Sequence, residues 1–327
     1  MTKKDAYRRS IEWRGISNRF GEGLQMVKGL RKRVAQMALP IARFYIRYMP
    51  FSTGKSFLFK RFGWRDSNYT VRTKSGVRMA GRSADLVQGF IYYFGVWEPN
   101  LSAFVSSRLK EHPARTFVDV GANVGYFSLL AASHLDKGSV VAIEAFPSIF
   151  KKLEANVRLN GFGNIRLLPW AVTDGDRDIP MFHAGLGNEG ATTSLAGKFG
   201  GESLIVPGKA LPSLLTAQEI RSIKLIKIDV EGAEYSVVVG MRALLDSLAD
   251  DAEVVIEITP SAYSEGELEE VFAIFRAARF TPYKLENSYD PNYYIRAPRV
   301  APPQRLQSLP TQQTDVVFSR FSAEALN

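Results

Sequence analysis

An acidic residue followed by a glycine-rich turn marks the middle of the chain. Asp119 begins the run Asp-Val-Gly-Ala-Asn-Val-Gly-Tyr, in which Gly121 and Gly125 allow a strand to turn tightly into a helix. A dinucleotide-binding turn needs a middle glycine for close approach to a diphosphate, and this chain has Asn123 there. The turn therefore favours a compact nucleoside without a diphosphate bridge. Asp119 could accept a hydrogen bond from an ammonium group of that ligand, or could only hold the turn.

A second acid follows at the spacing that ribose binding needs. Glu144 ends an apolar run and stands 19 residues after Gly125. A carboxylate about 20 residues beyond such a turn can accept hydrogen bonds from both ribose hydroxyls. The turn and the acid together predict a nucleoside site more strongly than the turn alone.

A third acidic group surrounds Gly232 and contains Asp229, Glu231 and Glu234. Carboxylates that converge beside a nucleoside could act as general bases, ligate a metal or bind backbone amides at a helix start. Asp229 ends an apolar run, so we expect it to act in function. For Glu234, a capping or purely structural bond is at least as good an interpretation as chemistry.

These positions require a parallel sheet to bring them together. From residue 116 onward, short apolar runs alternate with helical stretches, which is typical of a parallel sheet covered on both faces. Seven strands are predicted, over residues 116–120, 139–144, 165–168, 223–229, 253–258, 280–285 and 314–319. They fit one doubly wound α/β domain, whose ligands bind beyond the carboxyl ends of the strands.

The part of the chain before this sheet is strongly basic. Residues 1–82 contain 20 Lys and Arg against 4 Asp and Glu, a charge of +16, which leaves −7 for the rest. Apolar residues in this part recur at steps of three and four, at Val27, Leu30, Val34, Met37, Ile41, Phe44 and Tyr48. The spacing predicts an amphipathic helix kinked at Pro40. The helix could pack on the body of the protein, or residues 24–48 could lie on an anionic membrane.

Between this helix and the sheet, residues 69–73 and 77–79 predict a β-hairpin, and residues 85–110 predict helices interrupted at 98–100. The chain has no cysteine, which excludes disulfides, thiolate catalysis and Cys-ligated zinc. No pair of histidines has the spacing of metal ligands, so no metal site is predicted. No apolar stretch reaches the ~18 to 20 residues of a membrane span, and no apolar core follows the charged start. We therefore expect a cytoplasmic protein, with peripheral contact at the inner membrane face as a further option.

With these motifs assembled, the chain resembles the FkbM family of S-adenosylmethionine-dependent methyltransferases. The resemblance covers residues 69–320 and is most specific at Ile-Lys-Ile-Asp-Val-Glu-Gly-Ala-Glu, residues 226–234. Residues 93–99, the glycine turn, Glu144 and residues 156–161 are further matching blocks. The family implies a class I methyltransferase (Rossmann-like) fold, with the seventh strand inserted antiparallel between the fifth and sixth. Its members typically methylate hydroxyl groups on sugars, polyketides and other secondary metabolites.

The resemblance also implies a cofactor site for S-adenosylmethionine. Residues expected around the methionine moiety are Asp119, Gly121, Asn123 and Gly125, with Asp229 at the mouth of the cleft. Glu144 is expected on the ribose, and the adenine is expected to border Phe146, Trp170 and Ala171. Two departures stand out: Ala145 replaces a usual proline, and residues 210–213 lack an aspartate that the family tends to have before strand four.

An alcohol acceptor needs a group that takes its proton. The candidates are Asp229, Glu231 and His183, of which Asp229 ranks first. His183 precedes a glycine-rich polar segment, residues 187–194, which could bind the acceptor or could be a plain surface loop.

Other functions remain open at this point. An NAD-linked oxidoreductase would share Glu144 but would need glycine at position 123. A methyltransferase acting on nucleic acid or protein could use the basic front, although amino-directed base methylation usually goes with a Pro-Pro-aromatic run where this chain has Val-Glu-Gly, residues 230–232. A non-catalytic binding protein would be expected to lose the acids. We therefore predict O-methylation of a hydroxyl on a sugar, glycolipid or secondary metabolite.

The predicted domain organisation is a basic helical extension (1–66), a hairpin and helical lead-in (67–112) and a methyltransferase domain (113–327).

Overall fold

The computed structural model describes residues 39–63, 65–183, 192–193, 203–296 and 300–322. The chain divides into two compact units, residues 1–62 and 63–327.

The first unit contains a helix over residues 39–48 and the helix α2 (Lys55–Phe62). The buried face of the first helix consists of Leu39, Ala42 and Ile46. The predicted apolar stripe is not that face, because Ile41, Phe44 and Tyr48 are 71%, 55% and 54% exposed. The three residues therefore do not pack within the first unit, and the alternatives of packing on the second unit or lying on a membrane stay predictions. Pro40 lies within the helix, and the residues before it, which a kink would involve, lie outside the described residues.

The second unit begins with the predicted hairpin and two helices. Strands β1 (Asn68–Arg72) and β2 (Arg78–Arg82) pair antiparallel, and helices α3 (Leu86–Phe94) and α4 (Pro99–Glu111) follow. Asp85 caps α3 by accepting a hydrogen bond from the backbone N–H of Gln88, and Gly95 ends it in a left-handed conformation. Glu98, directly before α4, also has a left-handed backbone, with φ 43°.

All seven predicted strands occur in one mixed sheet. Its order is β13-β12-β14-β11-β10-β3-β4-β5, in which β14 runs antiparallel to both β11 and β12. The bounds are β3 (Thr116–Val120), β4 (Ser139–Ile143), β5 (Ile165–Leu168), β10 (Ile223–Ile228), β11 (Glu253–Ile258), β12 (Thr281–Leu285), β13 (Gln304–Arg305) and β14 (Thr314–Ser319). The predicted class I methyltransferase topology is confirmed, and the short edge strand β13 is an addition.

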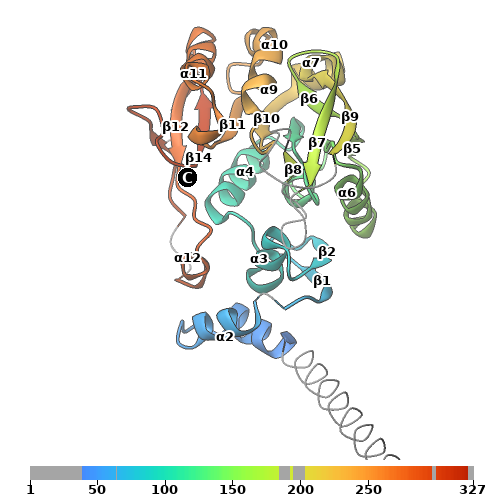
Figure 1. The fold of residues 1–327 in the computed structure, drawn as a ribbon, viewed down its shortest axis with the longest axis vertical. Helices are drawn as coiled ribbons and strands as arrows, with labels where there is room; N and C mark the ends of the chain where they lie inside the picture. Colours follow the sequence, from blue (N-terminus) through green and yellow to red (C-terminus); the bar gives the residue numbers. More distant parts are fainter. Residues whose placement is uncertain (1–38, 64, 184–191, 194–202, 297–299, 323–327) are drawn as a thin grey trace, which may run out of the picture. The chain divides into compact units, whose positions relative to one another are not determined.

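The central strands are apolar because both faces of the sheet are covered. Every residue of β3 and of β10 is buried, as is typical of parallel strands beneath helices on both sides. Helix α4 packs on α5 and on β10, while α9 packs on β11 and on α11 (Figure 1). The remaining helices are α5 (Tyr126–Ala132), α6 (Pro147–Asn160), α7 (Leu211–Leu214), α8 (Ala217–Ser222), α9 (Glu234–Gly240), α10 (Arg242–Ser247), α11 (Glu267–Ala277) and α12 (Pro291–Arg296).

A second sheet stands where the sequence predicts an insertion without strands. Its order is β6-β9-β7-β8, made of β6 (Ala171–Thr173), β7 (Arg177–His183), β8 (Thr192–Thr193) and β9 (Ser203–Ala210). Strands β7 and β9 pair antiparallel over most of their length, and β6 pairs parallel with β9. Most of the predicted acceptor loop, residues 187–194, lies outside the described residues.

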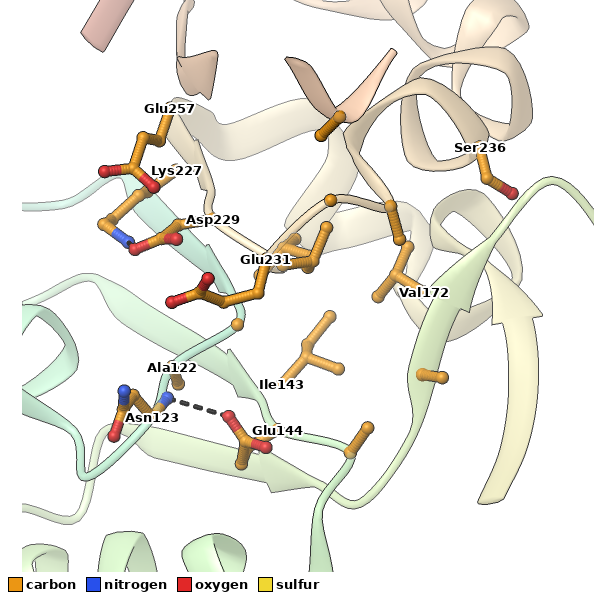
Figure 2. A pocket seen from close by; sticks show the side chains of 18 of the residues that line it. Ala122, Asn123, Ile143, Glu144, Val172, Lys227, Asp229, Glu231, Ser236 and Glu257 are labelled. Carbon is orange, nitrogen blue, oxygen red and sulfur yellow. Dashed lines mark hydrogen bonds and ion pairs between the residues drawn. The ribbon is translucent and has the colours of Figure 1, made fainter. Parts of the chain in front are cut away.

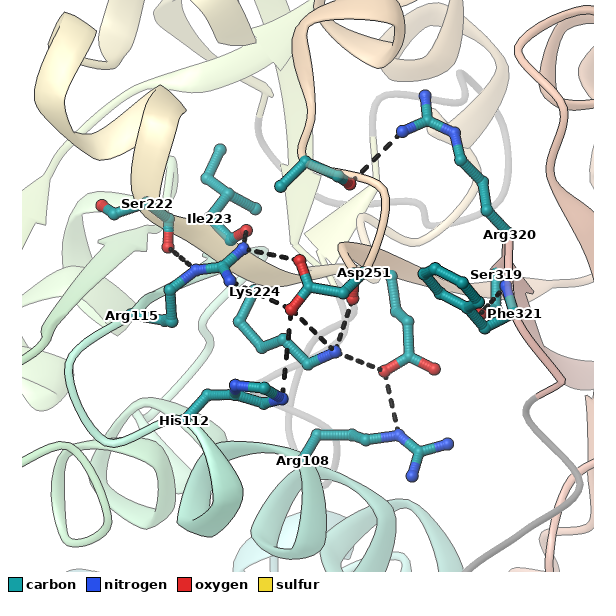
Figure 3. A network of polar contacts seen from close by, with 12 residues as sticks. Arg108, His112, Arg115, Ser222, Ile223, Lys224, Asp251, Ser319, Arg320 and Phe321 are labelled. Carbon is teal, nitrogen blue, oxygen red and sulfur yellow. Dashed lines mark hydrogen bonds and ion pairs between the residues drawn. The ribbon is translucent and has the colours of Figure 1, made fainter.

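A polar network joins the amino ends of the central strands (Figure 3). The Arg115 guanidinium, before β3, donates to both carboxylate oxygens of Asp251, before β11, at 3.0 and 3.1 Å. Arg115 also donates to the carbonyl oxygens of Ser222 and Ile223 at the start of β10. Lys224 Nζ donates to the carbonyl oxygen of Asp251 at 2.5 Å. The network therefore ties β3, β10 and β11 together at the end of the sheet opposite the predicted site residues.

No helix within the described residues is long and apolar enough to cross a membrane.

Candidate functional site

A cavity of about 610 Å³ opens at the carboxyl ends of β3, β4, β10 and β11. Its walls come from the glycine turn, from the end of β4, from the second sheet and from the segment after β10. Figure 2 shows two groups of polar side chains in it: Asn123 and Glu144 on one side, and Lys227, Asp229, Glu231 and Glu257 on another.

The glycine turn after β3 is closely packed against the end of β10. A Cβ atom on Gly121 would lie 1.8 Å from the carbonyl oxygen of Asp229, and one on Gly125 would lie 2.6 Å from Cδ1 of Leu153. Both glycines have positive φ, and so does Asn123, with φ 52°. Asparagine is one of the few residues that adopts this conformation readily. Gly121, Asn123 and the backbone after them line the cavity.

Glu144 links the turn to the end of β4. One carboxylate oxygen accepts a hydrogen bond from the backbone N–H of Asn123 and the other from that of Phe146, both at 2.9 Å. Burial raises the pKa of Glu144 to about 7, although these two hydrogen bonds act against the rise. Each oxygen keeps a second lone pair, so the carboxylate can still accept hydrogen bonds from a diol in the cavity.

Asp119 lies beneath the turn rather than in the cavity wall. Its side chain is 1% exposed, and Oδ2 accepts a hydrogen bond from Ser128 at 2.5 Å. Oδ1 is buried without a hydrogen-bond partner among the described residues. Burial raises the pKa of Asp119, while the positive charge of Lys227 opposes the rise. Asp119 therefore lies next to the cavity, and its Oδ1 atom can accept a hydrogen bond that no described residue donates.

The side predicted to border the adenine is formed by Ala145, Trp170, Ala171 and Val172, which line the cavity. Lys209 Nζ lies 4.6 Å from the centre of the Trp170 ring, close enough for a cation–π contact. Phe146 is buried and is absent from the cavity wall; its contribution is the backbone N–H that holds Glu144.

Asp229 and Glu231 lie in the cavity wall on the opposite side. Lys227 Nζ donates to Asp229 Oδ2 at 2.8 Å. Burial alone would lower the pKa of Lys227, but the charge of Asp229, followed by that of Asp119, raises it, so the lysine stays charged. Glu234 plays a structural part: its Oε1 accepts hydrogen bonds from the backbone N–H groups of Val230 and Gly232.

His183 ends strand β7, where its backbone pairs with Thr192. Its side chain lies outside the described part of the structure, so the prediction that it acts as a base stays a prediction. Among the residues that are described, no group of three or more His, Asp or Glu side chains is arranged to hold a metal ion.

Several acidic or phenolic residues of the cavity wall are not singled out by the sequence, among them Glu98, Glu257 and Tyr289. Glu257 is next to last in β11, so the carboxyl end of strand five carries the same signal as the ends of strands one, two and four. Glu98 stands in the interruption between two helices, and its left-handed backbone is a mark of functional sites that a sequence does not show. Tyr289 belongs to an irregular segment after β12 with no pattern to single it out.

The cavity suits S-adenosylmethionine. The two carboxylate oxygens of Glu144 face the cavity and can accept hydrogen bonds from ribose hydroxyls. The apolar wall of Ala171 and Val172 suits the adenine base, and the turn at Gly121 leaves room for the methionine part. Carboxylates outnumber cationic side chains among the lining residues, which favours a ligand that carries a positive sulfonium.

Solved structures similar to this chain include several methyltransferases. An S-adenosylmethionine-dependent O-methyltransferase from Thermotoga maritima is 12% identical with a TM-score of 0.40, and the match covers 82% of this chain and 83% of that chain. A methyltransferase from Agrobacterium tumefaciens is 12% identical with a TM-score of 0.42, covering 78% and 70%. Precorrin-6y C5,15-methyltransferase from Geobacter metallireducens is 10% identical with a TM-score of 0.38, covering 68% and 88%.

A curated relative and a protein-family model match parts of the amino-acid sequence. The AMB antimetabolite synthetase AmbE of Pseudomonas aeruginosa is 28% identical over an alignment of 180 residues, and the match covers 45% of this chain. The match spans only 8% of that much longer protein. The description "Methyltransferase FkbM domain" matches residues 119–282, half of the chain. The chain therefore belongs to the FkbM family of methyltransferases, whose methyl donor is S-adenosylmethionine.

Proposed function

We propose that this protein transfers the methyl group of S-adenosylmethionine to a hydroxyl group of a sugar, a glycolipid or a secondary metabolite. The observation that carries the proposal is the cluster of carboxylates at the end of the cavity away from Glu144, formed by Asp229, Glu231 and Glu257. Carboxylates accept hydrogen bonds from hydroxyl groups and can take the proton that an alcohol loses when it is methylated.

In the donor half, Glu144 binds the ribose hydroxyls, and Gly121, Asn123 and Gly125 surround the methionine moiety. Trp170 and Ala171 border the adenine. Phe146 acts through its backbone N–H on Glu144, and Asp119 acts from below the turn, where its Oδ1 can accept a hydrogen bond from a water or an ammonium group. These roles are supported by the places of the residues in and around the cavity wall.

In the acceptor half, Asp229 and Glu231 orient the hydroxyl group toward the donated methyl. Both side chains lie in the cavity wall between the Glu144 side and Glu257 (Figure 2). Methyl transfer from a sulfonium is an in-line displacement, so holding the hydroxyl oxygen in line with the methyl carbon and the sulfur supplies much of the acceleration.

The donor half is tested by calorimetry with S-adenosylmethionine and S-adenosylhomocysteine. Glu144→Ala should abolish binding of both while the thermal unfolding transition persists. Asp178→Ala, on the second sheet outside the cavity wall, is the control and should bind normally. Unchanged affinity of Glu144→Ala would overturn the ribose assignment, and tight binding of NADH in place of the methyl donor would overturn the function.

The acceptor half is tested by mass spectrometry on extracts incubated with the enzyme and a methyl donor labelled with deuterium. Glycan, glycolipid and small-metabolite fractions should yield a product carrying one labelled methyl on oxygen. RNA and protein fractions are assayed in parallel, and labelling confined to either of them would show that the hydroxyl proposal is wrong.

We also propose that the first unit contacts an anionic membrane surface. Five large apolar side chains of this unit are exposed: Ile41, Phe44, Tyr48, Phe51 and Phe57. Arg43, Arg47, Lys60 and Arg61 lie on the same two helices, and a basic helix with exposed aromatic residues is typical of interfacial binding. An acceptor embedded in a membrane would then be brought close to the enzyme.

Sedimentation with vesicles tests this contact. The protein should bind vesicles containing phosphatidylserine, bind neutral vesicles weakly, and lose binding as salt rises. The double variant Phe44→Ser, Phe57→Ser should bind at least tenfold more weakly. Phe321→Ser, which removes an exposed aromatic side chain from the other unit, is the matched control. Equal binding of all three proteins would exclude these side chains as an anchor.

A further inference from the structure

Tyr289 bridges the buried Glu98 and the half-buried Glu257 at the acceptor end of the cavity. Its hydroxyl oxygen lies 2.9 Å from Oε1 of Glu98 and 2.5 Å from Oε1 of Glu257. The Tyr289 ring is stacked on Trp97, with ring centres 5.2 Å apart and planes 9° from parallel. All four side chains line the cavity. The bridge is therefore held firmly in place next to the acceptor.

The bridge requires one more proton than the tyrosine supplies. A phenol has a single hydrogen and can donate it to only one of the two carboxyl groups. Both contacts have hydrogen-bond length, so the second contact needs a proton on a carboxyl oxygen. Burial and the neighbouring carboxylates raise the pKa of Tyr289, which keeps the phenol protonated. One of the two glutamates therefore carries a proton in the resting protein.

The partners of the two glutamates show which one is neutral. Glu257 Oε1 accepts hydrogen bonds from Tyr289 and from Nε2 of Gln313, the latter at 2.8 Å, and two donors suit an ionised carboxylate. Glu98 is 3% exposed and has Tyr289 as its hydrogen-bonding partner for Oε1. Burial raises the pKa of both glutamates well above the usual range, with the next largest contribution from Asp315 for Glu98 and from Asp229 for Glu257. The hydrogen-bond partners therefore decide which of the two carries the proton. The hydrogen-bond chain thus runs from the Glu98 carboxyl through the Tyr289 hydroxyl to the Glu257 carboxylate.

Asp229 is poorly suited to receive a proton in this environment. Its Oδ2 accepts the hydrogen bond of Lys227, whose side chain is 5% exposed. Protonating Asp229 would leave the buried ammonium without its nearest counter-charge, and an unpaired charge in a buried position is strongly destabilising. Protonating Glu257 leaves that ion pair intact.

Resting on the proposed function, we infer that Glu257 is the general base of the methyl transfer and that Glu98, through Tyr289, positions it and keeps it ionised. The acceptor O–H bond breaks and its proton passes to a carboxylate oxygen of Glu257. The acceptor oxygen forms a bond to the methyl carbon, the bond from that carbon to sulfur breaks, and the electron pair stays on sulfur. The positive charge of the sulfonium and the negative charge of Glu257 disappear in the same step, so no uncompensated charge is left in the buried cluster.

The proton on the glutamate carboxyl can be detected without the methyl acceptor. Infrared spectroscopy is carried out on the full-length protein bound to S-adenosylhomocysteine. At pH 8.5 the wild-type protein should show the carbonyl stretch of a protonated carboxyl that is lost in Glu98→Gln and shifted in frequency in Glu257→Gln. The matched control is Glu270→Gln, which should leave the band unchanged: Glu270 accepts a 2.7 Å hydrogen bond from Tyr235, one phenol for one carboxylate, and needs no extra proton. A band that survives in Glu98→Gln, or a wild-type spectrum without one, would overturn the inference. Tyr289→Phe replaces Glu257→Gln if that variant fails to fold, and it should shift the same band.

The base is then assigned from single-turnover rates with the acceptor found by the labelling screen. Glu257→Gln should lower the rate roughly a hundredfold to ten-thousandfold, with unchanged affinity for S-adenosylhomocysteine. Glu98→Ala should shift the acidic limb of the pH profile, and Glu98→Gln, whose amide donates as the neutral carboxyl does, should restore it. A near-normal rate in Glu257→Gln would overturn the assignment. If the screen yields no methylated hydroxyl, the proposed function fails while the infrared result still decides where the proton resides.

Discussion

The carbonyl oxygen of Asp229 occupies the space that a side chain on Gly121 would need, 1.8 Å from the position of its Cβ atom. The backbone N–H of Asp229 also donates to the carbonyl oxygen of Val120 at 3.0 Å. The turn that would hold the methyl donor and the strand end that would orient the acceptor are thus in direct backbone contact. Moving either one moves the other.

Gly121→Ala should therefore abolish binding of S-adenosylhomocysteine and lower thermal stability. Gly161→Ala is the matched control, because Gly161 has a similar φ of 70° but a Cβ atom there would have no other atom within 4 Å. Both variants carry the left-handed backbone penalty of ~1 to 2 kcal/mol, and only the first adds a collision with the backbone. Calorimetry and thermal unfolding compare them. Similar losses in both would mean that backbone conformation, rather than the contact with Asp229, explains the effect.

Affinity for the cofactor should depend on pH through Glu144. Its pKa of about 7 in the free protein means that the carboxyl is largely protonated below neutral pH. Ribose hydroxyls donate to the ionised form, so binding lowers the pKa and releases a proton. Affinity for S-adenosylhomocysteine should rise with pH up to about 7, by at most tenfold per pH unit, and then become constant.

Calorimetry between pH 5.5 and 8.5 in buffers of different ionisation enthalpy checks both the slope and the released proton. Glu144→Gln should bind more weakly and should lose the pH dependence. A slope that survives in Glu144→Gln would assign the titration to another group.

Asn156 holds the hairpin and the glycine turn together. Its amide Nδ2 donates to the carbonyl oxygen of Val124, and its Oδ1 accepts from the backbone N–H of Ala80, both at 2.9 Å. Asn156→Asp would place a carboxylate oxygen against the Val124 carbonyl in a site that is 1% exposed. We expect a loss of ~1 to 3 kcal/mol or more in the free energy of unfolding, together with weaker cofactor binding.

Urea unfolding and calorimetry measure these two effects. Asn160→Asp is the control, because Asn160 makes equivalent bonds to Arg78 at a more exposed position where water can replace them. If Asn160→Asp destabilised the protein as much as Asn156→Asp, burial would not be the cause.

The network at the opposite end of the sheet should affect stability and leave the chemistry alone. Burial alone would raise the pKa of Asp251, but the hydrogen bonds from Arg115 and the charge of Lys224 lower it below its usual value. The stabilising contribution of the carboxylate is therefore present above about pH 4 and is lost as the pH falls through the lowered pKa. Asp251→Asn should cost roughly 1 kcal/mol at neutral pH, a modest value because the side chain is 34% exposed.

The difference in stability between the wild type and Asp251→Asn should be constant from pH 5 to 8 and should shrink below pH 4. Urea unfolding at each pH measures it. Cofactor affinity should be unchanged, and a large change there would show that the two ends of the sheet are coupled.

The main sheet was predictable because its strands are buried on both faces. The predicted strands 116–120 and 253–258 contain buried runs of apolar, mostly β-branched residues, and β3 and β11 have those bounds. The second sheet shows a weaker pattern, because β6 has three residues, β8 has two, and charged residues and prolines interrupt β7 and β9. Proline alone does not exclude a strand, since Pro282 lies in β12.

Some residues of the candidate site were predictable from the sequence and others were not. Glu144, Asp229 and the glycine turn lie at or just beyond strand ends, where ligands bind in this fold. Glu144, Asp229, Gly121 and Asn123 line the cavity, whereas Asp119 and Gly125 do not. Glu98 and Tyr289 come from irregular segments 191 positions apart in sequence, and their contact depends on tertiary packing. In the first unit, the spacing of apolar residues did not identify the buried face, which is formed by Leu39, Ala42 and Ile46.

The position of β14 in the sheet determines the order in which the protein can fold during synthesis. β12 is synthesised before β14 but joins the sheet only alongside it, because β14 lies between β11 and β12. β14 also places Asp315 directly opposite Glu257 on β11. A growing polypeptide that has not yet released residues 314–319 therefore carries an open strand edge on β11 and an unpaired β12, both of which favour aggregation. The acceptor end of the cavity is thus among the last parts of the molecule to form. A chain truncated before Thr314 should therefore aggregate and be inactive rather than partly active.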